Sequence, residues 1–215
     1  MKFKAAIFDL DGVIVDTAKY HYLAWKRLAA SYGFDFTEKD NERLKGVSRM
    51  ASLEILLSIG NITLSEEEKI SAAEKKNAWY LEYITKMTSD EILPGALNYL
   101  KVLKDNNILI SLGSASKNAP LIIKRLGLEE YFDAIVDGYS VQKVKPDPEV
   151  FLVAAQRLNM KAEDCVVFED APAGIEAAIA ANMQCVGIGD NEILSKADIV
   201  IPGLYAAEER VGIGQ

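Results

Sequence analysis

The sequence predicts an α/β fold in which a parallel β-sheet core is interrupted by an α-helical insertion. Short β-branched runs alternate with amphipathic segments over most of the chain, which is the pattern of βαβ units whose parallel sheet is covered on both faces. Between residues 17 and 85 this alternation stops and only helical periodicity remains. We therefore place the insertion directly after the first strand.

Each expected element follows from its local pattern. Strands are expected at residues 3–8, 108–112, 134–136, 165–168, 185–188 and 199–201. Core helices are expected at 96–105, 119–126, 148–158 and 174–181, and helices of the insertion at 17–32, 49–59 and 65–87. Ser65 precedes three glutamates, which is a signal for a helix N-terminus. We assign residues 1–15 and 91–215 to the core domain and 16–90 to the insertion, and we expect the tail from 208 to be loosely held.

Composition and charge exclude several classes of protein. The net charge of −8 over 215 residues argues against a general affinity for nucleic acid or anionic membranes. No apolar run approaches the roughly 20 residues that span a bilayer, and the first strand begins too early to leave room for a signal peptide. Cys165 and Cys185 lie in apolar strand-like runs, so we expect two buried thiols in a reducing cytoplasm.

Polar side chains follow the first four expected strands of the core. They are Asp9 and Asp11 after the first strand, Ser114-Ala115-Ser116-Lys117-Asn118 after the second, Lys145 after the third, and Glu169 and Asp170 at the end of the fourth. Because the carboxyl ends of parallel strands meet at one edge of the sheet, these side chains should converge. Paired carboxylates at a strand end are costly unless a cation or a reaction uses them.

Phosphoryl transfer with magnesium is the chemistry that these residue types fit. Mg²⁺ prefers oxygen ligands, which Asp9 and Asp170 can supply. Ser114 and the backbone amides before a helix start can hold phosphate oxygens, and Lys145 can neutralise the charge that builds during transfer. A carboxylate nucleophile would divide the reaction into two steps through an aspartyl-phosphate. Asp11 projects to the same side of an extended chain as Asp9 and could act as acid and base.

Structural alternatives exist for several of these residues. Asp9-Leu10-Asp11-Gly12 could begin a calcium loop, but the other ligands of an EF-hand are absent at the required spacing. Asp170 could serve only as a helix N-cap, and Lys145 could be a solvated loop lysine. The convergence of four polar clusters at one edge favours the functional interpretation.

In order and spacing, four segments resemble the motifs of the haloacid dehalogenase superfamily of phosphotransferases. They are Asp9-Leu10-Asp11-Gly12-Val13-Ile14, Ser114, Lys145-Pro146 and Glu169-Asp170. The resemblance implies a Rossmann-like parallel sheet core with an inserted α-helical cap domain. It also implies a cis Lys145–Pro146 bond, and Mg²⁺ held by Asp9, the Asp11 carbonyl and Asp170, with Glu169 at or beside these ligands.

Within that superfamily the chain resembles the β-phosphoglucomutase family. The matching segments are Tyr20-His21-Tyr22-Leu23-Ala24-Trp25, Leu44-Lys45-Gly46-Val47-Ser48-Arg49, Lys75-Lys76-Asn77 and Ser114-Ala115-Ser116-Lys117-Asn118. This family interconverts β-D-glucose 1-phosphate and glucose 6-phosphate through β-glucose 1,6-bisphosphate. The resemblance therefore implies an enzyme whose partners are small-molecule sugar phosphates.

The resemblance also assigns roles to the matching residues. Asp9 would be the nucleophile and Asp11 the general acid and base. Three groups would surround the transferring phosphate: Ser114, Ala115 and Lys145. Four would bind the distal phosphate: Arg49, Ser116, Lys117 and Asn118. In the cap, His21 and Lys76 would couple sugar binding to closure. The sugar site would be lined by Trp25, Leu44, Lys45, Gly46, Val47 and Ser52.

Three functions remain open at this point. A mutase needs two phosphate sites because its bisphosphate binds in either orientation, and the planar guanidinium of Arg49 suits a stationary phosphate. A phosphatase of small phosphate esters needs no second site, and a catalytically silent sugar-phosphate-binding protein is the third candidate. Packing or surface roles are the alternatives for His21, Trp25, Arg49 and Lys76. We expect a monomer without nucleic acid or membrane partners.

Overall fold

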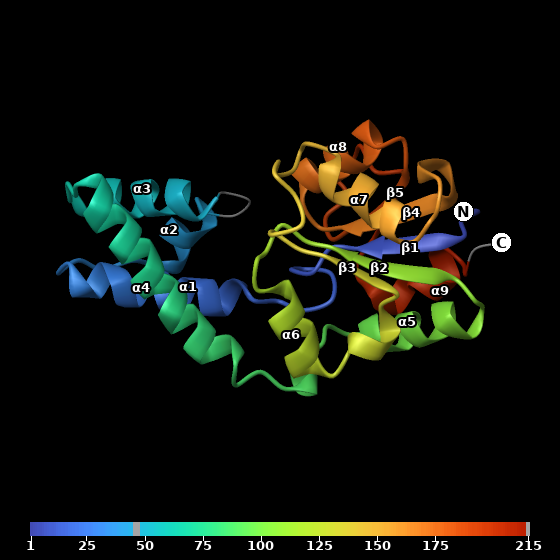
Figure 1. Ribbon diagram of the computed structural model, residues 1–215, viewed down its shortest axis with the longest axis horizontal. Coiled ribbons are helices and arrows are strands. Elements are labelled where there is room, and N and C mark those ends of the chain that lie inside the picture. The colour runs from blue at the N-terminus through green and yellow to red at the C-terminus, as the bar shows by residue number, and fades with distance from the viewer. Residues whose placement is uncertain (45–47, 214–215) are drawn as a thin grey trace. The chain divides into compact units, whose positions relative to one another are not determined.

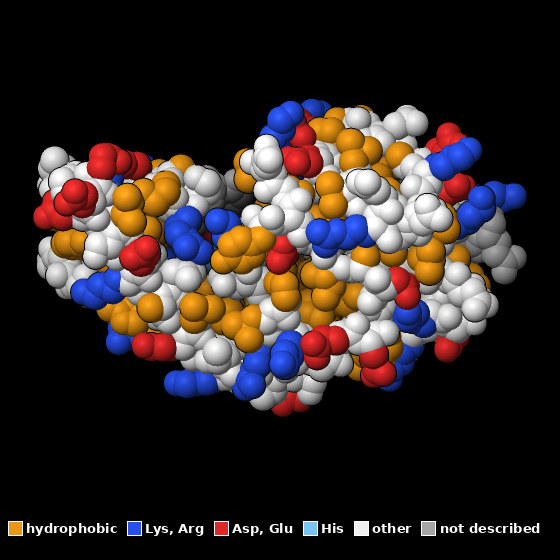
Figure 2. Space-filling model, in the orientation of Figure 1, with side chains coloured by type: hydrophobic (Ala, Val, Ile, Leu, Met, Phe, Trp, Pro, Cys, Tyr) orange, Lys and Arg blue, Asp and Glu red, His pale blue; other side chains and the backbone are white. Residues whose placement is uncertain are grey.

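A computed structural model describes residues 1–44 and 48–213 of the chain. It divides into two compact units, which we call the core unit (Met1–Asp16 and Met87–Gln215) and the helical unit (Thr17–Lys86). On the face shown in Figure 2, basic and acidic side chains are interspersed over the surface of each unit. Within the described ranges, no helix has both the length and the apolarity needed to cross a membrane.

The core unit is built on a sheet whose described strands are all paired in parallel, in the order β3-β2-β1-β4-β5-β6 (Figure 1). The strands are β1 Ala5–Phe8, β2 Leu109–Gly113, β3 Ala134–Val136, β4 Cys165–Glu169, β5 Gln184–Ile188 and β6 Ile199–Ile201. β1 and β4 are buried along their whole length, as expected for strands covered on both faces. The predicted α/β fold with a parallel sheet is confirmed.

Helices cover both faces of this sheet. They are α5 Ala96–Asp105, α6 Ala119–Leu126, α7 Glu149–Arg157, α8 Pro172–Ala180 and α9 Ala207–Arg210. In Figure 1, α7 and α8 lie on one side of the sheet, whereas α5, α6 and α9 lie on the other. Short 3₁₀ helices complete the connections: η1 Ser89–Glu91, η2 Glu129–Tyr131, η3 Ala162–Asp164 and η4 Leu204–Ala206.

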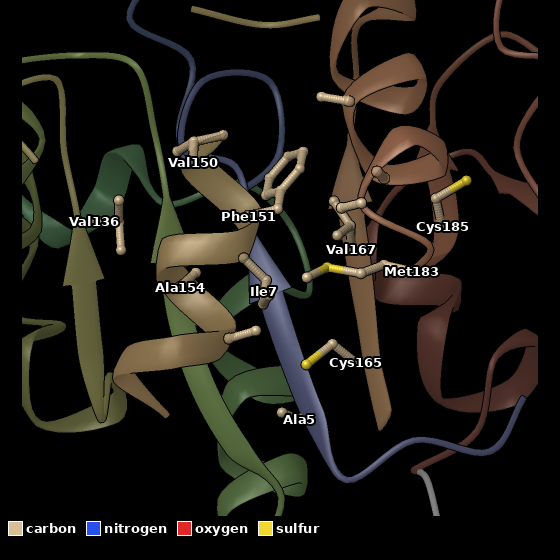
Figure 3. Close-up of a cluster of buried hydrophobic side chains, with 14 of the residues drawn as sticks. Ala5, Ile7, Val136, Val150, Phe151, Ala154, Cys165, Val167, Met183 and Cys185 are labelled. Atoms are coloured by element: carbon tan, nitrogen blue, oxygen red, sulfur yellow. The ribbon is translucent and has the colours of Figure 1, made fainter. Parts of the chain in front are cut away.

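A buried apolar cluster joins α7 and α8 to the sheet. Figure 3 shows Phe151 and Ala154 of α7 close to Ile7 of β1, and all three side chains are fully buried. Cys165 and Cys185 belong to the same cluster and are free thiols, which confirms the prediction of two buried thiols. Because α7 follows Lys145 in the chain and β1 precedes Asp9, the packing of α7 against β1 holds the backbone near these two residues in a fixed relative position.

An aromatic cluster lies on the other face and holds the C-terminal segment. Phe8 stacks on Phe168 with ring centroids 4.6 Å apart, and Tyr99 of α5 packs edge-on against both rings. The Tyr99 side chain is buried, so its hydroxyl needs an acceptor, and it donates to the carbonyl of Gly212 at 2.7 Å. Val211 is buried too. The expectation of a loose tail is therefore wrong for residues up to 212, because this packing anchors them.

The helical unit consists of α1 Ala18–Ser31, α2 Glu38–Glu42, α3 Arg49–Gly60 and α4 Glu66–Ile84. A buried apolar cluster from α1, α3 and α4 forms its core. Ser65 and Glu68 form a capping box at the start of α4, which confirms the N-terminal signal. α2 was not predicted, although Thr37 and Asp40 cap it in the same reciprocal way.

We expect Phe168→Ala to lower the free energy of unfolding by about 3–5 kcal/mol, because it removes a fully buried ring from the stack with Phe8 and Tyr99. Urea titration followed by near-ultraviolet circular dichroism measures this loss. Ile193→Ala is the matched control, since Ile193 is 62% exposed and should change stability by no more than about 0.5 kcal/mol. Equal losses in the two variants would contradict the packing described.

Candidate active site

Asp9 and Glu169 lie side by side at the carboxyl edge of the sheet. Phe8 is in register with Phe168 across the β1–β4 pair, so Asp9 and Glu169 are the next residues of the two strands. The amide of Asp9 donates to the carbonyl of Phe168 at 2.9 Å and keeps the two chains paired up to this point. The strand order reverses between β1 and β4, and ligands bind at such a switch point in open α/β sheets.

Lys145 bridges these two carboxylates. Its Nζ lies 2.6 Å from Oδ1 of Asp9 and 2.7 Å from Oε2 of Glu169. The ammonium also lies over the ring of Phe151, 4.8 Å from its centroid. The Lys145–Pro146 peptide is cis, as the family resemblance implied. Lys145 thus lies at the carboxyl edge of the sheet with 12% of its side chain exposed, and the interpretation as a solvated loop lysine is wrong.

The charges in this cluster shift the pKa values of its members. Burial alone would lower the pKa of Lys145, but the carboxylates of Asp9 and Glu169 raise it above its ordinary value. Burial and the nearby charge of Asp9 raise the pKa of Glu169 to about 8, against the opposing effect of Lys145. Desolvation and Asp9 likewise raise the pKa of Asp170 to about 6. Negative charge is therefore in excess here, and Lys145 stays a cation.

These residues fit a divalent metal ion. Asp9, Glu169 and Asp170 each offer a carboxylate oxygen, and the three oxygens lie within 4.8 Å of one another. An all-oxygen donor set with excess negative charge suits a hard cation. Gly12, at φ 75°, permits the close approach of Asp170, because a Cβ at this position would lie 2.0 Å from Oδ2 of that carboxylate.

Asp11 lies in a tight turn between β1 and the helical unit. The amide of Gly12 donates to the carbonyl of Val15, and that of Ile14 to the carbonyl of Leu10. Asp11 itself forms an isolated bridge with Val15 and is half-buried. The turn thereby places its side chain on an anchored backbone two residues beyond Asp9.

The segment from Ser114 to Asn118 links β2 to α6 and has the properties of a phosphate loop. Ser114 is buried, and its amide donates to the carbonyl of Val136 on the neighbouring strand. Oγ of Ser114 accepts from the amide of Ser116, and Oγ of Ser116 accepts from the amide of Asn118. Ala115 and Lys117 are exposed. The loop leads into the N-terminus of α6, where backbone amides favour an anion.

In the helical unit, His21 of α1 and Lys76 of α4 form a buried pair. Nζ of Lys76 lies 2.8 Å from Nδ1 of His21 and within 5.0 Å of the centroids of the Trp25 and Tyr80 rings. Burial, followed by the charge of Arg49, lowers the pKa of Lys76 to about 7. Burial and the two cations Lys76 and Arg49 also hold the pKa of His21 well below its ordinary value. Among the described residues, Lys76 forms no ion pair with a carboxylate.

Arg49 begins α3 directly after the N-cap Ser48, and its side chain is held by the neighbouring helix. A guanidinium N–H donates to Oδ1 of Asn77 at 2.8 Å, one residue after Lys76 on α4. Ser52 is buried one turn further along α3. The helical unit therefore presents two basic side chains: Lys76, which is buried, and Arg49, which an amide orients.

The structure separates the candidate residues into groups. Asp9, Lys145, Glu169 and Asp170 are brought together, and so are His21 and Lys76. Trp25 and Leu44 belong to the apolar core of the helical unit, so they have a packing role there. The candidates Lys45, Gly46 and Val47 lie outside the described residues.

Two residues of the helical unit that contact these candidates received no role from the sequence. Asn77 orients Arg49, and Tyr80 packs against His21 with ring centroids 4.1 Å apart. Asn77 stands next to Lys76 in one of the matching segments, which was the available signal. For Tyr80, the spacing of four residues from Lys76 on a helix was the only signal.

Comparisons with known proteins identify similar chains. The family model for haloacid dehalogenase-like hydrolases matches residues 3–182. The chain is 46% identical over 200 residues to a β-phosphoglucomutase of Bacillus subtilis, covering 92% of this chain and 88% of the relative. A crystal structure of β-phosphoglucomutase from Clostridium difficile is 48% identical and superimposes with a TM-score of 0.86, over 94% of this chain and 92% of that one. A phosphorylated carbohydrates phosphatase of Thermotoga maritima is 34% identical over 205 residues and 92% of both chains.

We expect Lys76 to make stability depend on pH in a specific direction. Between its folded pKa of about 7 and its ordinary value of 10.5, the unfolded chain holds one more proton at this position. Raising the pH through this window therefore favours the folded state. The free energy of unfolding of the native protein minus that of Lys76→Met should therefore increase by about 1.4 kcal/mol per pH unit between about pH 7.5 and 9.5.

Urea titrations at a series of pH values measure this difference. Lys75→Met is the matched control, because Lys75 is exposed on the same helix, and the comparison with the native protein should show no such slope. A difference between native protein and Lys76→Met that stays constant with pH would show that Lys76 is not desolvated as described.

Proposed function

This chain belongs to the haloacid dehalogenase-like hydrolase family, and within it we propose a β-phosphoglucomutase, an intramolecular phosphotransferase of the isomerase class. It would interconvert β-D-glucose 1-phosphate and glucose 6-phosphate through β-glucose 1,6-bisphosphate. Similarity to two β-phosphoglucomutases at 46% and 48% identity favours this activity over that of the phosphatase at 34%. The observation in the structure that carries the proposal is the guanidinium of Arg49, which Asn77 orients in the helical unit and which suits a second, stationary phosphate.

One half of the reaction would form the aspartyl-phosphate on Asp9. The Asp9 carboxylate attacks one phosphorus of the bisphosphate, the bond to that sugar oxygen breaks as Asp11 gives the oxygen a proton, and an aspartyl-phosphate and a sugar monophosphate form. Lys145, which is 2.6 Å from Asp9, neutralises negative charge on the transferring group. Ser114 and the amide of Ala115 would hold its remaining oxygens.

Asp11 would move the proton in both directions. When the sugar hydroxyl attacks the aspartyl-phosphate, Asp11 accepts the hydroxyl proton, and it returns a proton to the leaving sugar oxygen in the reverse step. The turn that holds Asp11 gives this group a fixed backbone position. Each complete cycle leaves Asp11 in the protonation state in which it began.

The acidic cluster would hold Mg²⁺. The ligands would be a carboxylate oxygen of Asp9, the backbone carbonyl of Asp11 and the carboxylate of Asp170, with Glu169 at or beside them. The ion would supply positive charge against the phosphoryl oxygens. Glu169 would also hold Lys145 in place. One of its carboxylate oxygens accepts from Nζ of Lys145, and the other accepts from the amide of Ala171.

The helical unit would act as the cap. His21 and Lys76 would couple sugar binding to cap closure, which excludes water from the aspartyl-phosphate. The sugar site would include Trp25, Leu44, Lys45, Gly46, Val47 and Ser52. The distal phosphate would be bound by Arg49, Ser116, Lys117 and Asn118. We also propose that the enzyme is a monomer and that it works in the reducing cytoplasm, which suits its two free, buried cysteines.

Phosphorus NMR on β-glucose 1-phosphate, with Mg²⁺ and a trace of the bisphosphate, tests the proposal. We expect the glucose 6-phosphate signal to grow, with little inorganic phosphate and no turnover of the α-anomer. Net release of inorganic phosphate without glucose 6-phosphate would support the alternative, a sugar-phosphate phosphatase, which the Thermotoga relative exemplifies. If Asp9 accepted neither a phosphoryl group nor, with Mg²⁺, beryllium or aluminium fluoride, the result would favour a catalytically silent sugar-phosphate-binding protein.

We expect Arg49→Ala to lower mutase turnover about 10- to 100-fold, the size of a lost charged hydrogen bond to phosphate. Phosphorylation of Asp9 by acetyl phosphate should stay near the native rate, because this donor has no second phosphate. Coupled assays and radiolabelled phosphate measure the two rates. Arg27→Ala is the control, since Arg27 pairs with Glu82 on the surface of the helical unit. Equal losses in both reactions of Arg49→Ala would argue against a distal-phosphate role.

A further inference from the structure

A rigid turn follows β3 and presents an exposed aromatic ring. Oδ1 of Asp137 accepts from the amides of Tyr139 and Ser140 at 3.1 and 3.0 Å, and from Oγ of Ser140 at 2.7 Å. Three bonds to one carboxylate oxygen fix the backbone of the turn. Tyr139, which lies between Asp137 and Ser140 in the chain, is 75% exposed.

This turn packs directly against the phosphate loop. The amide of Gly138 donates to the carbonyl of Ser116 at 3.2 Å, and a Cβ on Gly138 would lie 2.4 Å from the carbonyl oxygen of Ala115. Only a glycine allows the two backbones to approach so closely without displacement. The conformation of residues 115–117 is therefore coupled to that of the turn.

The exposed ring contacts the one charged side chain of the phosphate loop. Nζ of Lys117 lies over the Tyr139 ring, 5.0 Å from its centroid. Among the described residues, Lys117 forms no ion pair, so the ring is the group that restrains this ammonium. A cation held by a ring face keeps its N–H donors available to an anion, whereas a carboxylate partner would occupy them.

We propose that Tyr139 is a positioning residue that sets specificity for the phosphate that is not transferred. By restraining Lys117 before substrate binds, the ring lowers the cost of ordering a long side chain on the distal phosphate. This inference rests on the proposed function, because it assigns Lys117 to that phosphate. The ligand class is a sugar bearing two phosphates, or one phosphate remote from the reacting centre.

Tyr139→Ala, Tyr139→Phe and the matched control Tyr205→Ala test this inference. Tyr205 is 63% exposed in the core unit, so it controls for the loss of an exposed ring. In Tyr139→Ala we expect the KM of the mutase reaction to rise about 2- to 5-fold with kcat little changed, the effect of an exposed cation–π contact. Tyr139→Phe, which keeps the ring, should restore the native KM. Asp9 phosphorylation by acetyl phosphate should be unaffected in Tyr139→Ala.

Calorimetry with glucose 1,6-bisphosphate separates this inference from the proposed function, because it needs no turnover. In an Asp9→Asn background, Tyr139→Ala should weaken bisphosphate binding 2- to 5-fold, as in the KM. The double variant Lys117→Ala/Tyr139→Ala should bind the bisphosphate as tightly as Lys117→Ala alone, because the two residues act through one contact. Three results would each overturn this role of Tyr139, whether or not the native enzyme is a mutase. They are additive losses of bisphosphate affinity in the double variant, an unchanged affinity in Tyr139→Ala, and an affinity in Tyr139→Phe as weak as in Tyr139→Ala.

Discussion

The double contact of Lys145 with Asp9 and Glu169 is the interaction on which the site depends. Parallel strands β1 and β4 end side by side and place two carboxylates, with Asp170 beside them, at one edge of the sheet. One ammonium against three carboxylates leaves negative charge in excess, which the raised pKa values of Glu169 and Asp170 express. A buried charge cluster of this kind is costly by itself. A divalent cation would offset the excess, so the same imbalance that costs stability would favour the binding of such an ion.

Among the described residues, the little-exposed Lys76 and Lys145 lie in opposite electrostatic environments. Lys145 has carboxylate partners, which raise its pKa despite burial. For Lys76, burial and then the nearby charge of Arg49 lower the pKa to about 7. A lysine desolvated beside another cation lacks a counter-ion. An anionic ligand would supply one and would draw a proton onto Lys76 as it binds. The surroundings of Lys76 would thus favour an anion, whereas the carboxylates around Asp9 would favour a cation.

Features that depend on local sequence pattern could be predicted from the sequence alone. Alternating strands and helices predicted the parallel sheet, and Ser65 with Glu68 predicted the start of α4. Contacts between distant residues carry no comparable signal. The anchoring of the tail by Tyr99 joins residues 113 positions apart, and the restraint of Lys117 by Tyr139 depends on β2 and β3 being neighbours in the sheet. α2 was missed because five residues with no buried side chain show no hydrophobic periodicity.

Mutase and phosphatase differ in what attacks the aspartyl-phosphate, not in how it forms. On the proposed mechanism both reactions would use Asp9, Lys145 and the acidic cluster, so these residues could not select between a sugar hydroxyl and water. Selection requires that the hydroxyl be held at the phosphorus at a high effective concentration, since water is abundant. A second phosphate is the strongest anchor that the sugar carries, and each group that restrains it raises that concentration. Asn77 orients Arg49, and Tyr139 restrains Lys117. By restraining the second phosphate, these residues would favour transfer to the sugar hydroxyl over hydrolysis, and thus isomerase over phosphatase activity.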